Sequence, residues 1–266
     1  MMADGSVRRQ ARRLTSVGGE TLDETIAEEA AIALVYNGVS HAVMMATPCD
    51  LEDFARGFSL TERIVERPSE IYDIETELVG RGIEVRLEIA AQRMAGLQER
   101  RRSLAGRTGC GLCGVDSLDA ALRTVARVEA AVPVAREAIG RAMTALPSEQ
   151  RINRLNGATH AAGWASSDGS LVAVREDVGR HNALDKLAGA LARQKVPRRG
   201  GFVVVTSRCS YEMVQKAAAI GASAIAAVSA PTSLAIETAE QAGVALVAFV
   251  RDGRLTAYAH ADRIVL

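Results

Sequence analysis

The chain has 266 residues, of which 48% are hydrophobic and 24% are charged, a balance that excludes a disordered chain and a bundle of membrane helices. Its 32 basic and 32 acidic residues cancel, and aromatic residues make up only 3%, so it lacks both the positive field and the stacking platforms of nucleic-acid-binding proteins. We therefore expect neither nucleic acid nor a membrane among its partners.

Residues 1–14 carry four arginines but no apolar run of the length found in signal peptides. We expect residues 1–20 to form a disordered basic arm and the protein to be cytoplasmic. In that compartment the four cysteines of the chain stay reduced, so structural disulfides are not expected.

Residues 21–105 are predicted to form a small β-rich subdomain. Two apolar runs, 30–36 and 39–46, flank Asn37-Gly38, a pair that accepts the positive φ angles of a tight hairpin turn. The subdomain is therefore expected to begin with an antiparallel strand pair.

A helix and a second hairpin are expected next. The pattern predicts a helix over 51–64, with Asp50 as its N-terminal cap. Apolar and charged residues then alternate over 71–79 and 83–90, which predicts two half-exposed strands around a glycine-rich turn.

Cys110 and Cys113 form a Cys-x-x-Cys pair with glycine before, between and after the two thiols. The glycines leave this turn few steric restraints, and the arginines upstream favour the thiolate, which is the nucleophilic and metal-binding form of cysteine. The pair thus indicates a reactive sulfur site that faces something anionic. Half of a zinc site, a redox pair or two packed cysteines are the alternatives, although the charged, non-periodic run at 92–107 is not the strand that precedes a thioredoxin-like pair.

From residue 106 onward the chain is predicted to form an α/β domain that starts with the Cys-x-x-Cys loop. Helices are expected at 117–125, 133–146, 147–155, 181–194, 210–220 and 231–242. Strands are expected at 171–174, 202–206, 224–228 and 244–250. This alternation favours an open, largely parallel sheet with helices on both faces.

Three arginines follow strands of this expected sheet, namely Arg208, Arg251 and Arg254. In open α/β sheets ligands bind beyond the carboxyl ends of the strands, where helix N-termini and arginines can bind phosphate. The sequence therefore predicts a phosphorylated small molecule as ligand. The alternative is that these arginines are ordinary solvated or ion-paired surface residues.

Two polar runs add further candidates. A small-residue turn leads to His160, and eight polar or ionisable side chains crowd the strand-to-helix junction at 175–186. Asp177, His181 and Lys186 could orient a ligand, activate a thiol or hold a ribose. Alternatively, they form a buried ionic network without chemistry.

Taken together, these motifs resemble the formate dehydrogenase accessory sulfurtransferase family, often written FdhD. The resemblance covers roughly residues 25 to 262, and its most specific part is the Glu-Asp-Val-Gly-Arg-His-Asn run at 176–182 within the matching segment 176–186. The other matching segments are 36–38, 46–58, 109–114, 159–162, 206–216 and 249–254. Many relatives have glycine at the position of Ala158 and a residue other than cysteine at that of Cys209.

The resemblance implies an enzyme that transfers sulfur as a cysteine persulfide, with Cys110 as the carrier and Cys113 as its partner. The sulfur would come from a cysteine desulfurase. It would go to the molybdenum of the bis-molybdopterin guanine dinucleotide cofactor, bound as a substrate, before that cofactor enters formate dehydrogenase. Guanosine diphosphate (GDP) is expected to mimic part of the cofactor, and no permanent metal is expected.

The resemblance also implies a fold and a binding segment. The fold is α/β, a cytidine-deaminase-like three-layer sheet with helices on both faces and a smaller N-terminal β-rich subdomain, and members form homodimers. The segment for the cofactor is Phe249, Val250, Arg251, Asp252, Gly253 and Arg254. Further candidates for cofactor binding are Ser207, Arg208, His160, Asp177, Arg180, His181 and Lys186.

Two other functions compete with this reading. His160 and the Cys-x-x-Cys pair suggest a zinc-dependent nucleotide deaminase, but such enzymes place a glutamate two residues after the histidine, where this chain has Ala162. The second alternative is a chaperone that binds the cofactor without moving sulfur.

Overall fold

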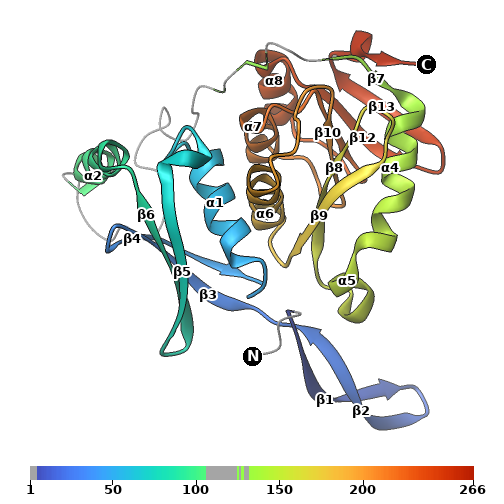
Figure 1. Cartoon of the computed structure of the whole chain (residues 1–266). Helices are drawn as coiled ribbons and strands as arrows, with labels where there is room; N and C mark the ends of the chain where they lie inside the picture. Colours follow the sequence, from blue (N-terminus) through green and yellow to red (C-terminus); the bar gives the residue numbers. More distant parts are fainter. Residues whose placement is uncertain (1–4, 106–124, 126, 129–131) are drawn as a thin grey trace.

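The computed structural model of the chain describes residues 5–105, 125, 127–128 and 132–266 (Figure 1). The Cys-x-x-Cys pair lies outside the described residues, as does nearly all of the helix predicted over 117–125. The predicted boundary between residues 105 and 106 falls at the end of helix α2 (Ala91–Ala105).

The N-terminal subdomain is a four-stranded sheet in the order β4-β3-β6-β5. Its strands are β3 (Ala30–Tyr36), β4 (Val39–Ala46), β5 (Ile71–Val79) and β6 (Gly82–Ile89). Both predicted hairpins are confirmed, and Asn37 and Gly38 have φ angles of 46° and 78°. The turn forms at this point because these two residues tolerate left-handed backbone conformations.

Two helices cover the inner face of this sheet. Helix α1 (Leu51–Thr61) buries Phe54 and Phe58 against it, as its apolar spacing predicts. Asp50 is the N-cap residue of α1, as predicted, but its backbone is left-handed and its carboxylate makes no capping hydrogen bond. The charged run after β6, in which the sequence showed no periodic pattern, forms α2, which packs Met94 and Leu97 on the same core.

Residues 6–27 form a β-hairpin, so the prediction of a disordered arm over residues 1–20 is wrong for the described part. Strands β1 (Ser6–Thr15) and β2 (Gly18–Ala27) pair in antiparallel fashion and stand off the body of the molecule (Figure 1). The sequence did not predict these strands because they contain no apolar run. Ladder hydrogen bonds between the strands and the ion pair of Arg13 with Glu20 hold them together instead.

The C-terminal domain is built on a six-stranded sheet in the order β13-β12-β11-β10-β8-β9. Its strands are β8 (His160–Ala165), β9 (Leu171–Asp177), β10 (Phe202–Val205), β11 (Ala224–Ala227), β12 (Ala245–Arg251) and β13 (Arg254–Ala259). The central strands β10, β11 and β12 are parallel, whereas β8, β9 and β13 run antiparallel to their neighbours. The expected parallel sheet is thus confirmed at its centre and flanked by antiparallel strands that were not all predicted.

Helices cover both faces of this sheet, which confirms the three-layer α/β class (Figure 1). One face packs on α6 (Arg180–Arg193), α7 (Tyr211–Ala219) and α8 (Ser233–Ala242), and the other on α4 (Arg136–Glu149). Alternate residues of β10 point to opposite layers, Val203 toward α6 to α8 and Val204 toward α4.

The remaining elements are short. They are α5 (Arg151–Asn156), β7 (Val134–Ala135), β14 (Ile264–Val265) and the 3-10 turns Pro68–Glu70 and Ala261–Arg263. Pro147 was expected to begin a separate helix but lies inside the last turn of α4, shortly before the chain turns into α5 at Gln150. Within the described part of the chain, no helix is both long and apolar enough to cross a membrane.

The subdomain and the C-terminal domain meet where α1 crosses α6. At this crossing Gly57 lies on the backbone of Asp185, and Gly189 lies on the backbone of Asp53. A side chain at either glycine would overlap the facing carbonyl, so the two helices approach closely only because both positions lack a Cβ. The ammonium of Lys216 on α7 bridges the junction, with an ion pair to Glu62 at the end of α1 at 2.8 Å and another to Asp185 of α6 at 2.9 Å.

Candidate functional site

The sheet brings several of the predicted site residues to one edge. Because β10, β11 and β12 are parallel, their carboxyl ends lie side by side, and Arg208 and Arg251 are found there. Strand β8 runs the other way, so His160 at its start lies at this edge, and Asp177 at the end of β9 is its direct partner. Residues from four separate strands thus converge, as the rule for α/β sheets predicts.

Asp177 and Lys186 form a fully buried ion pair at this edge. Their charged atoms are 2.7 Å apart and both side chains are inaccessible to solvent. The carboxylate also accepts hydrogen bonds from the backbone of Thr47 and Gly179 and from the amide of Asn182. Neither residue has surface left with which to contact a ligand, so the pair fixes the junction of β9 and α6 on the 47–49 loop.

The neighbouring polar residues keep some exposure. Burial, together with the charge of Arg180, lowers the pKa of His160, which favours the neutral imidazole. At the start of α6, Nε2 of His181 lies 2.7 Å from a carboxylate oxygen of Glu212 on α7, and this hydrogen bond holds the pKa of Glu212 below its usual value. Glu212 was not predicted as a site residue, because nothing in its sequence neighbourhood shows that two helix N-termini meet.

Arg180 carries a feature that fits an anionic ligand. Its Nε atom is buried and has no hydrogen-bond partner among the described residues. A buried donor without a hydrogen-bond partner lowers the stability of the fold, so such a group is commonly one that binds a ligand atom. Arg180 also lies close enough to His160 and Glu212 to influence both electrostatically.

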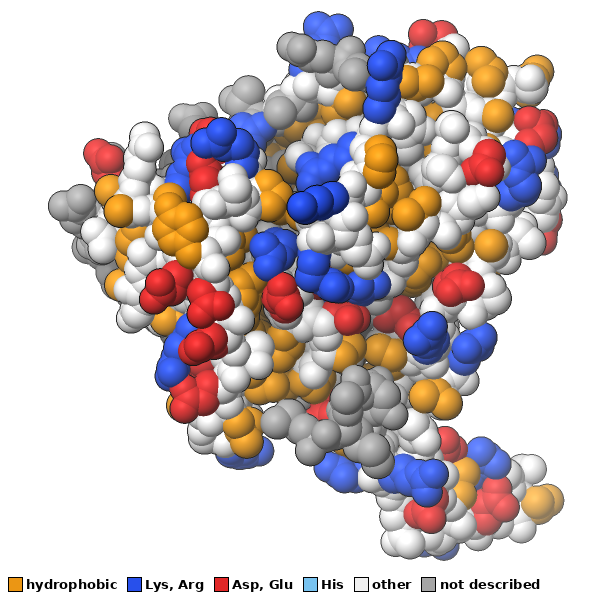
Figure 2. Space-filling view, in the orientation of Figure 1, with side chains coloured by type: hydrophobic (Ala, Val, Ile, Leu, Met, Phe, Trp, Pro, Cys, Tyr) orange, Lys and Arg blue, Asp and Glu red, His pale blue; other side chains and the backbone are white. Residues whose placement is uncertain are grey.

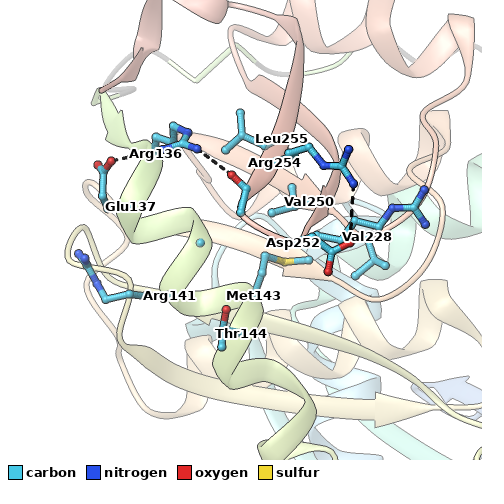
Figure 3. Close-up of a pocket in the computed structure, with 13 residues that line it drawn as sticks. Arg136, Glu137, Arg141, Met143, Thr144, Val228, Val250, Asp252, Arg254 and Leu255 are labelled. Atoms are coloured by element: carbon cyan, nitrogen blue, oxygen red, sulfur yellow. Dashed lines mark hydrogen bonds and ion pairs between the residues drawn. The ribbon is translucent and has the colours of Figure 1, made fainter.

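A pocket of about 600 Å³ lies between α4 and the β12–β13 turn (Figure 3). The predicted segment from Arg251 to Arg254 forms one wall, and α4 contributes Arg136 and Arg141, which the sequence did not single out. Met143, Val228, Val250 and Leu255 add apolar lining. The pocket therefore combines guanidinium groups, which bind phosphate, with an apolar surface on which a planar base can lie.

Hydrogen bonds hold the arginine side of this pocket in place. Arg136 donates to the carbonyl of Gly253 at 2.7 Å, which ties α4 to the β12–β13 turn (Figure 3). Arg141 donates to the carbonyl of Asp168, while the guanidinium of Arg254 is 3.9 Å from the carboxylate of Asp252 and largely exposed. Arg254 is thus held less firmly than Arg136 and Arg141 and can turn toward a ligand.

Eight predicted residues lie outside the lining of this pocket: the five at the strand edge described above, His160, Asp177, Arg180, His181 and Lys186, and also Phe249, Ser207 and Arg208. Phe249 has a left-handed backbone, and its ring lies 6.5 Å from that of Tyr258, so it shapes the β12–β13 turn. Ser207 is buried and donates to the carbonyl of Arg208, whose own side chain is exposed.

The two described cysteines are poor nucleophiles. Burial raises the pKa of the partly buried Cys49 thiol and raises that of the fully buried Cys209 to about 12. Within the described ranges, no group of three or more His, Cys, Asp and Glu side chains is arranged to hold a metal ion. Ala162 is fully buried, so no carboxylate takes the place of the deaminase glutamate there.

Cys209 is expected to resist alkylation in the native protein. Its thiol is inaccessible and stays protonated at about pH 8, and the thiolate is the form that reacts. Treatment with iodoacetamide before and after denaturation, followed by peptide mass analysis, should show Cys209 modified only after denaturation. Modification of Cys209 at the same rate as an unfolded thiol would contradict its placement in the core.

Comparison with known proteins agrees with this architecture. The model of the FdhD/NarQ family matches residues 27–265. The chain is 56% identical to the sulfur carrier protein FdhD of Cupriavidus necator over 241 residues, 91% of this chain and 84% of that protein. It is 53% identical to the protein of the same name from Bordetella petrii over 250 residues, 94% of this chain and 90% of that protein.

The fold also has a solved counterpart. The crystal structure of a candidate formate dehydrogenase accessory protein from Desulfotalea psychrophila matches with a TM-score of 0.74 and 23% identity, covering 98% of this chain and 99% of that one. At this identity the likeness shows the fold alone. The family match over most of the chain and the close curated relatives show that the chain belongs to the FdhD/NarQ family.

Proposed function

We propose that this chain is a sulfur carrier that serves formate dehydrogenase. It accepts sulfur as a persulfide on Cys110 from a cysteine desulfurase and delivers it to the molybdenum of the bis-molybdopterin guanine dinucleotide cofactor, its substrate. Support comes from the name shared by its curated relatives and from the glycine-framed Cys-x-x-Cys pair. We further propose that the carrier works in the cytoplasm as a homodimer.

Loading of the carrier is a thiol exchange. The Cys110 thiolate attacks the terminal sulfur of a persulfide on the donor enzyme, the S–S bond of the donor breaks, and the donor cysteine leaves as a thiolate. A persulfide now stands on Cys110, and no outside oxidant or reductant is needed. The arginines that precede the pair in the sequence favour the anionic form of both sulfur groups.

The pocket between α4 and the β12–β13 turn carries the proposal for cofactor binding. A guanine dinucleotide carries phosphates and planar bases, and the pocket offers arginines beside an apolar surface. Arg180 at the start of α6, together with Arg208, would extend the positive surface along the sheet edge, and His181 next to Arg180 would offer a ring nitrogen for hydrogen bonding. In this scheme Lys186 and Asp177 do not contact the cofactor. Their buried ion pair holds β9 and α6 in position at that edge.

Complementation of a strain that lacks this protein separates sulfur transfer from chaperoning. A Cys110→Ala variant should fail to restore formate dehydrogenase activity while it still binds the cofactor. Restored activity would favour the chaperone. Stoichiometric zinc bound through Cys110 and Cys113 would instead favour the deaminase alternative.

The pocket is expected to bind GDP through its arginines. An Arg251→Ala/Arg254→Ala variant should bind GDP about tenfold more weakly, because each charge-assisted hydrogen bond to phosphate contributes on the order of 1 kcal/mol or more. Isothermal titration calorimetry measures the change. Arg199→Ala, in the exposed loop before β10 at the opposite edge of the sheet, is the matched control. Equal affinity of all three proteins would rule out the pocket as the binding site.

A further inference from the structure

The outer face of the N-terminal sheet is an acidic surface without a partner. Strands β5 and β6 place five carboxylates on this face and one arginine, Arg86, which pairs with Glu77 and Glu84. The carboxylates are those of Asp73, Glu75, Glu77, Glu84 and Glu88. Figure 2 shows acidic side chains gathered over this hairpin at the left of the molecule. We call these six residues the acidic face.

Repulsion between the carboxylates of the acidic face lowers the stability of the subdomain. Asp73 lies directly opposite Glu88, and Glu77 lies directly opposite Glu84. Like charges at directly opposed positions destabilise an antiparallel pair. Glu75 lies opposite Arg86, but within the described residues no basic side chain lies opposite Asp73 or Glu88 or pairs with them. A sheet that carries this repulsion on an exposed face is suited to a positively charged partner.

The same face continues into an apolar area on β3 and β4. Ala33 is opposite Glu84 on one side and Val43 on the other, and Ala31 is opposite Met45. Val43 and Met45 are 59% and 53% exposed, high values for large apolar side chains on a sheet. A partner for this surface should therefore carry apolar side chains beside its positive charges.

The β1–β2 hairpin has the complementary properties. It touches the rest of its own chain mainly at its base, through α5, and Leu14 and Val17 are 74% and 95% exposed. A two-stranded hairpin by itself is only marginally stable in water. Two arginines of β1, Arg8 and Arg12, lie on the same side of the hairpin as Leu14 and have no carboxylate partner within the described residues.

We propose that the β1–β2 hairpin of one copy of this chain lies on the acidic face of a second copy, and that the second copy returns the contact. The unpaired arginines of β1 then meet the unpaired carboxylates of β5 and β6, and the exposed apolar side chains of both surfaces leave water. The two surfaces also match in size, because β1 has ten residues and β5 nine, about 30 Å of strand each. A twofold axis makes the two contacts identical, so the assembly closes as a dimer.

Charge reversal tests the two surfaces separately. The hairpin variant is Arg8→Glu/Arg12→Glu, and the face variant is Asp73→Lys/Glu88→Lys. In sedimentation velocity runs, each variant alone should show a dimer dissociation constant raised about tenfold or more, and added salt should weaken the wild-type dimer. A variant with Glu237→Lys/Glu240→Lys, two exposed residues of α8, is the control and should dimerise like wild type.

Mixing the two variants gives the decisive result. In a heterodimer the reversed hairpin meets the reversed face, while the native hairpin meets the native face, so both contacts are complementary again. We expect the equimolar mixture to recover the wild-type dimer, which a misfolded variant could not do. A wild-type protein that is monomeric up to about 100 µM, variants that dimerise like wild type, or a mixture that stays dissociated would each overturn the proposal.

Discussion

Replacement of Lys186 by methionine is expected to lower the free energy of unfolding by about 3–5 kcal/mol, since it leaves the buried Asp177 carboxylate without its cation. Methionine keeps most of the volume of the lysine stem, so the loss reflects charge rather than a cavity. The carboxylate would retain its hydrogen bonds from Thr47, Gly179 and Asn182, which are not enough to offset the missing ammonium. Urea denaturation, followed through the single tryptophan, Trp164, measures the change.

Two further variants isolate the cause. Asp177→Asn/Lys186→Met removes both charges and should recover part of the lost stability, because no unpaired ion stays buried. Lys195→Met changes an exposed lysine just beyond the end of α6 and should shift stability by no more than about 0.5 kcal/mol. If Lys186→Met behaves like Lys195→Met, the buried pair does not hold the junction.

The α1–α6 crossing is expected to be equally intolerant of a single methyl group. In Gly57→Ala the new Cβ would overlap the carbonyl of Asp185, and the obstacle is backbone, which cannot rotate aside as a side chain can. Overpacking of this kind costs about 3 kcal/mol, and here it also separates the subdomain from the C-terminal domain. The measurement is the urea midpoint, with circular dichroism to confirm that the helices persist.

Gly96→Ala provides the matched control for this crossing. Gly96 lies inside α2, and a Cβ there meets nothing within 4 Å, so alanine should stabilise the helix by about 0.5–1 kcal/mol. The two substitutions are chemically the same and are expected to act in opposite directions. A Gly57→Ala protein as stable as wild type would mean that α1 and α6 do not approach as closely as described.

The elements that the sequence predicted correctly are those that depend on a few neighbouring residues. The turn at Asn37-Gly38 depends on two residues that accept positive φ, and α6 depends on apolar spacing that one face of a helix must satisfy. Strand β8 was missed because its alanines and Gly163 carry little strand propensity, and neighbours on both sides of the sheet hold it in place.

The site was predicted as a region and less well as a set of contacts. The rule for α/β sheets placed Arg251 and Arg254 at a binding edge, because it depends only on strand direction. Arg136 and Arg141 read as ordinary helix arginines, since only the packing of α4 beside the β12–β13 turn brings them to the pocket. Asp177 was predicted to contact a ligand but is fully buried, and the residue type alone does not show whether a polar side chain is buried.

The most direct test of the account is the mass of the peptide that contains Cys110. The purified protein is incubated with a cysteine desulfurase and cysteine, digested without reductant, and compared with a Cys110→Ala protein treated in the same way. We predict that the Cys110 peptide gains the mass of one sulfur atom and that reductant removes it. An unmodified Cys110 peptide, with sulfur found only on another cysteine or on none, would contradict the assignment of Cys110 as the sulfur carrier.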